Sequence, residues 1–238
     1  MLNFIGTIII VAATIVVLNT VISSLPVGRW PRLLLALTAG SWTGLAVALA
    51  SAGALTADAG GALVVGAMVA TPLILAAAVA FFFPAARKVM LALPLPLLVG
   101  LNVTRVGGVS FLLLAAAGEL AGPFPQSAGW GDILTGVFAL PALVLATRST
   151  GERDDLLYLW NGFGALDLFT AVTLGTLSAN GSPLQLIHAG VGSAAVQHLP
   201  WSLIPTVLVP AYLILHGIIF AQLRARSAER AGHPARTA

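Results

Sequence analysis

The chain has 238 residues, of which 58% are hydrophobic and only 8% are charged, and its mean hydropathy is +1.00. A soluble domain carries about 25% charged residues, so this composition excludes a water-soluble globular protein and predicts a polytopic membrane protein. Cysteine is absent, which excludes disulfides, thiolate zinc sites and iron–sulfur clusters. The net charge is +3, but the basic residues lie at expected helix ends and in the tail. The expected partner is therefore the lipid bilayer rather than a nucleic acid.

Seven apolar runs are each long enough to cross a bilayer, which takes about 20 residues in a helix. They occupy residues 3–22, 32–54, 61–82, 90–117, 130–147, 156–178 and 200–222. The first run is expected to stay in the protein, because no basic residue precedes it and no small-x-small cleavage site follows before Pro26. The sequence predicts an all-α transmembrane bundle of seven helices over residues 1–222, followed by a flexible basic tail over residues 223–238.

The basic side chains predict how the bundle is oriented. Ten of the eleven fall in the first, third and fifth connections and in the tail: Arg29, Arg32, Arg87, Lys88, Arg148, Arg153, Arg224, Arg226, Arg230 and Arg236. With seven spans these four segments share one side, which the positive-inside rule places in the cytoplasm. The N-terminus is then outside and the C-terminus is cytoplasmic.

The eleventh basic residue, Arg105, lies inside the fourth apolar run. A charge at membrane depth costs at least about 2.5–3.5 kcal/mol, so it persists only where something pairs with it or uses it. Asp167 lies about 18 Å along the sixth helix, within the range of about 12–22 Å expected for Arg105 along the fourth. We predict an ion pair between them, which serves either as a structural clamp or as a ligand or proton site. Asn102, one turn before Arg105, either holds the guanidinium or bonds a neighbouring backbone group.

Helical spacing groups other residues around this pair. Gly100, Thr104 and Gly108 recur every four residues, a small-residue stripe that lets another helix approach. In the sixth run, Trp160, Gly164 and Asp167 share one face. In the seventh run, Pro205 and Pro210 each free a backbone carbonyl about one turn earlier.

Three more polar residues lie in the last three runs. Asn161 and His216 fall at the same expected height, about 9 Å from the cytoplasmic end, and are predicted to form a hydrogen bond. His216 is interpreted as a structural histidine, with a proton relay or a metal ligand as alternatives. Asp132 is predicted to cap the helix that begins near residue 130, where a carboxylate is favoured, at the outer mouth of the site.

The segment from Ser178 to Pro200 is predicted to be an interfacial lid on the outer side, built as a broken amphipathic helix. It contains His188 and His198. Ten residues and two glycines separate them, a poor spacing for metal ligands, so a solvated loop is the default interpretation. No metal site or cofactor is assigned from the sequence.

Four motifs in the second half carry a resemblance. They are Arg105-x-x-Gly108-x-x-Phe111, Gly129-Trp130-Gly131-Asp132-Ile133-Leu134-x-Gly136, Trp160-Asn161-x-x-Gly164-x-x-Asp167, and Ile204-Pro205-x-x-Leu208-Val209-Pro210 leading to His216. Over about the last 125 residues the chain resembles a family of small bacterial multi-spanning inner-membrane proteins with no assigned activity. The resemblance implies that the protein lies in a bacterial cytoplasmic membrane, and it implies no particular fold or ligand.

These features favour a small-molecule or proton-coupled permease with a polar site in the last four helices. Protonation of Asp167 would release Arg105 to bind an anionic group. One alternative is a membrane-embedded redox or haem protein that uses His216 as a ligand. Another is a sensor or assembly factor in which the ion pair is only a clamp. The only lysine, Lys88, lies in a connection, which excludes a retinal Schiff base. No enzyme motif is recognised, so an enzyme is disfavoured.

Overall fold

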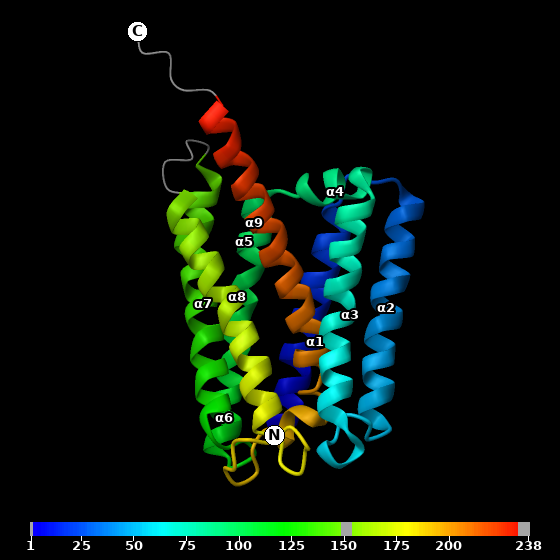
Figure 1. Cartoon of the computed structure of the whole chain (residues 1–238), viewed down its shortest axis with the longest axis vertical. Coiled ribbons are helices and arrows are strands. Elements are labelled where there is room, and N and C mark those ends of the chain that lie inside the picture. The colour runs from blue at the N-terminus through cyan, green and yellow to red at the C-terminus, as the bar shows by residue number, and fades with distance from the viewer. Residues whose placement is uncertain (1, 149–153, 233–238) are drawn as a thin grey trace.

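The protein is seen here as a computed structural model that describes residues 2–148 and 154–232, and the regular structure in these residues is helical. Long helices run side by side between the two ends of an elongated bundle (Figure 1). The α-helices are α1 (Leu2–Ser24), α2 (Arg29–Ser51), α3 (Gly61–Phe82), α4 (Pro84–Leu91), α5 (Leu95–Leu101), α6 (Val109–Ala116), α7 (Pro123–Thr147), α8 (Asp154–Leu177) and α9 (Val209–Gly232). Short 3₁₀ segments are η1 (Ala57–Ala59), η2 (Asn102–Gly108) and η3 (Ala194–Gln197), and η4 (Ile204–Leu208) is a π-helical turn.

Six helical segments of the described chain are long and apolar enough to cross a membrane: Leu2–Ser24, Arg29–Ser51, Gly61–Phe82, Leu95–Ala116, Pro123–Thr147 and Ile204–Arg230. They correspond to six of the seven predicted runs. The other run forms α8, which is long enough at 24 residues but carries Asn161 and Asp167 in its interior. An all-helical fold with several apolar helices is that of a multi-pass membrane protein whose outer faces contact lipid.

The predicted continuous helix over residues 90–117 is wrong, because the chain breaks after α4 and restarts at α5. Pro94 precedes α5 and Pro96 lies in its first turn, where a missing backbone N–H costs nothing. Gln222 on α9 bridges the break, since its side-chain amide nitrogen, Nε2, donates to the carbonyls of Leu91 at 3.1 Å and Leu93 at 2.7 Å. The break therefore has a partner on the last helix.

Two predicted boundaries are also corrected. Helix α7 begins at Pro123 rather than near residue 130, so Asp132 lies in its third turn and does not cap it. Helix α9 continues to Gly232, so residues 223–232 are helical rather than a flexible tail. Arg230 in this extension donates to Asp154 of α8 at 2.7 Å. Arg153, Arg236 and the rest of 233–238 lie outside the described residues.

The connection from α8 to η4 differs from the predicted broken amphipathic helix. It consists of turns and the short η3, and it is tied to neighbouring segments. Ser193 Oγ donates to the carbonyl of Gly175 at 2.7 Å, and the amide of Ala57 donates to Gln197 Oε1 at 3.0 Å. His188 and His198 are both exposed, and the described residues contain no group of three metal-ligating side chains.

Helix α2 is joined to η4 by one polar contact. Trp42 Nε1 donates to the carbonyl of Thr206 at 3.0 Å. That carbonyl lacks its usual helical partner, because the residue four positions later is Pro210, which has no N–H. The indole therefore satisfies an acceptor that proline leaves open.

We expect Trp42→Phe to lower the free energy of unfolding by about 0.5–1.7 kcal/mol, the range of interhelical hydrogen bonds in membrane proteins. The measurement is reversible unfolding in mixed micelles. Trp30→Phe is the matched control, since Trp30 is 63% exposed and makes no hydrogen bond through its indole among the described residues. Equal losses in the two variants would contradict this role for Trp42.

Candidate functional site

The centre of the bundle contains η2, a 3₁₀ segment that joins α5 to α6. Residues three apart share a face in such a helix, and the buried residues of η2 are Asn102, Arg105 and Gly108. Thr104 supports this turn, because its Oγ donates to the carbonyl of Leu101 at 2.6 Å. Because residues three apart share this face, the Arg105 side chain points into the bundle, toward α7, α8 and α9.

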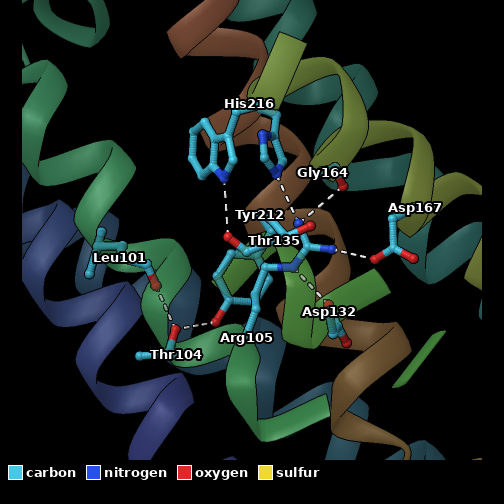
Figure 2. Close-up of polar contacts among 10 residues, drawn as sticks. Leu101, Thr104, Arg105, Asp132, Thr135, Gly164, Asp167, Tyr212 and His216 are labelled. Carbon is cyan, nitrogen blue, oxygen red and sulfur yellow. Dashed lines mark hydrogen bonds and ion pairs between the residues drawn. The ribbon is translucent and has the colours of Figure 1, made fainter. Parts of the chain in front are cut away.

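The Arg105 guanidinium lies among four acceptors from three helices (Figure 2). Its Nε donates to Asp132 Oδ1 at 2.7 Å, and its Nη2 donates to Asp167 Oδ2 at 2.6 Å. Its Nη1 contacts the carbonyl of Gly164 and His216 Nε2, both at 3.0 Å. The predicted ion pair between Arg105 and Asp167 is thus present, and Asp132 is a second carboxylate on the same cation.

The protonation of His216 follows from its two neighbours. Arginine can only donate, so His216 Nε2 accepts from Arg105 and carries no proton. The proton is then on Nδ1, which donates to Asn161 Oδ1 at 2.7 Å. Asn161 Nδ2 donates in turn to the backbone carbonyl of His216 at 3.0 Å. The predicted contact between Asn161 and His216 is present, and it orients the imidazole toward Arg105.

Glycines allow these groups to come together. A Cβ added at Gly131 of α7 would overlap the Asp167 carboxylate, and one added at Gly164 of α8 would overlap His216. A Cβ at Gly108 of η2 would overlap Asp132. Gly108, Gly131 and Gly164 therefore lie where polar side chains of the cluster pack against the backbone.

Gly131→Ala is expected to displace Asp167 from Arg105 and to lower the free energy of unfolding by about 1–3 kcal/mol, the usual cost of overpacking a core. Gly100→Ala is the control, because a Cβ there meets only Leu143 at ordinary contact distance, 3.8 Å. Unfolding in mixed micelles measures both. A Gly131→Ala protein as stable as Gly100→Ala would contradict the proposed overlap.

Five of the six predicted site residues belong to this network, and Asn102 does not. Its Nδ2 donates to the carbonyl of Leu98 at 3.0 Å. Of the two roles predicted for Asn102, this is the bond to a neighbouring backbone group. Sequence reasoning missed Tyr212, whose ring lies 5.7 Å from the Arg105 guanidinium carbon. Tyr212 is one helical turn before His216, so spacing alone placed it on the same face.

A cavity of about 50 Å³ adjoins the charge cluster. Its polar end is formed by Thr104, Arg105, Asp132 and Tyr212, and the rest of its lining is apolar apart from two glycines. The Asp132 side chain is 14% exposed, whereas that of Arg105 is 1% exposed. Asp167 is 6% exposed and is not part of the lining. The carboxylate of Asp132 is therefore the charged group best placed to meet a ligand.

A protein-family model described as a domain of unknown function, DUF8737, matches residues 62–224. The match covers more than half of the chain, which therefore belongs to this family. It begins in α3, upstream of the motifs that suggested a family from the sequence. No curated protein and no solved structure matches the chain.

Proposed function

We propose that this DUF8737 protein is a proton-coupled small-molecule permease of the bacterial cytoplasmic membrane. It crosses the membrane with seven helices, α8 included, and its polar site lies between η2, α7, α8 and α9. The observation that carries the proposal is the buried cluster of two carboxylates around one guanidinium beside a cavity.

The arrangement of the basic residues supports the topology. Helix α4, the connection between α1 and α2, and the C-terminal end of α9 lie at one end of the bundle (Figure 1). The start of α1 and the segment 178–200 lie at the other end. The first end carries Arg29, Arg32, Arg87 and Lys88, so the positive-inside rule makes it cytoplasmic. The N-terminus is then outside.

The charge balance of the cluster supports proton coupling. With Asp132 and Asp167 both ionised, the cluster around Arg105 has one net negative charge. An unbalanced charge at membrane depth costs at least about 2.5–3.5 kcal/mol. One proton or one ligand cation removes it. A site that is neutral with either of two occupants is suited to exchanging one for the other.

The geometry changes the role expected for Arg105. If Asp167 were protonated, Arg105 would still contact Asp132, the carbonyl of Gly164 and His216. A proton at Asp167 therefore does not free the guanidinium for an anion. We assign Arg105 the role of holding the two carboxylates in place, and the carboxylates the role of exchanging the proton.

The haem or metal alternative has less support from the site. Both ring nitrogens of His216 are engaged, Nδ1 with Asn161 and Nε2 with Arg105. A metal at either nitrogen would have to displace one of these partners. The geometry therefore favours the orienting role of His216.

Uptake into proteoliposomes with an imposed pH gradient tests the proposal. Labelled small solutes of cationic, anionic and neutral classes are presented to the full chain. We expect one class to accumulate with the gradient, and Asp132→Asn and Asp167→Asn each to abolish that accumulation. Glu119→Gln is the matched control, since Glu119 is an exposed carboxylate after α6. Failure of every class to accumulate, or unchanged coupling in the Asp132→Asn/Asp167→Asn double variant, would refute the permease.

A further inference from the structure

We infer that the cavity beside Asp132 binds a small organic cation that carries N–H donors on an apolar body. The inference rests on the proposed function, because it identifies this cavity as the substrate site of the permease. It is argued from the charge, the hydrogen-bonding groups and the walls of the cavity.

Charge is the first argument. The cluster has an excess carboxylate, and Asp132 is the carboxylate that is partly exposed and part of the lining. Its Oδ1 accepts from Arg105 at 2.7 Å, while its Oδ2 accepts no hydrogen bond from the described residues. Arg105 also lines the cavity, but four of its five N–H hydrogens already have acceptors, and its positive charge is outnumbered by the two carboxylates. The free charged atom is an acceptor.

The hydroxyl groups add a second acceptor. The single hydroxyl hydrogen of Thr104 goes to the carbonyl of Leu101, so in the 2.5 Å contact between Thr104 and Tyr212 the tyrosine is the donor. The Tyr212 oxygen then has lone pairs and no hydrogen left to offer. The hydroxyls of Thr104 and Tyr212 therefore offer no free hydrogen, and Asp132 and Tyr212 present acceptors to the cavity, which suits a cation with N–H donors.

The apolar walls of the cavity indicate what kind of ligand it can hold. Ile9, Ile10, Leu168 and Leu208 give the cavity aliphatic sides. A second cavity of about 60 Å³ shares Phe111, Ala171, Ile204 and Val209 with the first and reaches Ser193, Val196 and Gln197 of the outer segment. The two cavities therefore adjoin each other, one next to Asp132 and the other next to segment 178–200. Their mostly apolar walls suit a cation with a small apolar body.

Equilibrium binding of ethylguanidinium to the detergent-solubilised full chain tests the inference. Ethylguanidinium is permanently charged and has N–H donors; tetramethylammonium has the charge without donors; methanesulfonate has the opposite charge. We expect ethylguanidinium to bind more tightly than tetramethylammonium and methanesulfonate not to bind. Asp132→Asn should weaken ethylguanidinium about 10- to 100-fold, as for loss of a hydrogen bond to a charged group. Tyr212→Phe should weaken it about 2- to 10-fold, and Glu119→Gln should leave it unchanged.

A second substitution guards against misfolding. Asp132→Glu keeps the carboxylate, so it should retain binding to within about tenfold, and size-exclusion profiles compare the folded fraction of all variants. The inference is overturned if ethylguanidinium does not bind, if it binds Asp132→Asn as well as wild type, if tetramethylammonium binds equally well, or if methanesulfonate binds instead.

The binding and uptake experiments separate the two proposals. Gradient-driven uptake of an anionic or neutral solute, with no ethylguanidinium binding, would refute the cation site but support the permease. Binding of ethylguanidinium that depends on Asp132, with no uptake of any solute, would support the cation site and refute the permease.

Discussion

Arg105→Gln is expected to lower the free energy of unfolding by about 3–5 kcal/mol, the cost of removing one partner from a buried ion pair. The substitution leaves Asp132 and Asp167 facing each other without a counter-charge. It also removes a donor from the carbonyl of Gly164 and from His216. Reversible unfolding in mixed micelles measures the loss, and we expect the purified variant to be largely unfolded.

The control removes all three charges together. Arg105→Gln combined with Asp132→Asn and Asp167→Asn has no uncompensated charge, so it should recover most of the lost stability. If the triple variant were as unstable as Arg105→Gln, charge imbalance would not be the cause. A stable triple variant that transports normally would indicate that the cluster is a structural clamp. A stable triple variant that no longer transports would indicate that the cluster is a functional site.

His216→Phe is expected to cost about 2–4 kcal/mol, because it leaves Asn161 Oδ1 and one Arg105 N–H buried without partners. Asn161→Leu should cost a similar amount, since it removes the acceptor of the Nδ1 proton. Together the two substitutions should cost about 1–2 kcal/mol less than the sum, the coupling expected of residues in one hydrogen-bond network. The double-mutant cycle is measured by unfolding in micelles.

Asn102→Leu is the control for this cycle. Asn102 is fully buried, but within the described residues its side chain makes a single hydrogen bond, to the carbonyl of Leu98 one turn earlier. We expect its effect to add to that of His216→Phe within about 0.5 kcal/mol. Coupling as strong as that of Asn161 would place Asn102 in the network, and additive costs for Asn161 and His216 would exclude the network itself.

Some contacts were predictable because a bilayer leaves few alternatives. A charge in hydrocarbon needs a partner, and the depth of Asp167 made it the available partner for Arg105. The same argument from height paired Asn161 with His216, and both contacts are present. The functional role of these residues stays a proposal.

Other features depended on contacts between helices. An α-helical stripe predicts a period of four through Thr104, but η2 has a period of three that buries Asn102, Arg105 and Gly108. A 3₁₀ segment has weaker hydrogen bonds than an α-helix, so tertiary partners decide whether it forms. Here Arg105 has four acceptors on α7, α8 and α9.

The sequence by itself determined the apolar helices and the buried Arg105–Asp167 pair, since both follow from what hydrocarbon excludes. Only the tertiary structure decided the place of Asp132. The tripeptide Gly129-Trp130-Gly131 is typical of a helix start, yet α7 begins at Pro123 and continues through it. Within this continuous helix, Gly131 lets the Asp167 carboxylate pack against the backbone of α7. The next residue of α7, Asp132, is then a second carboxylate on Arg105, and it lines the cavity.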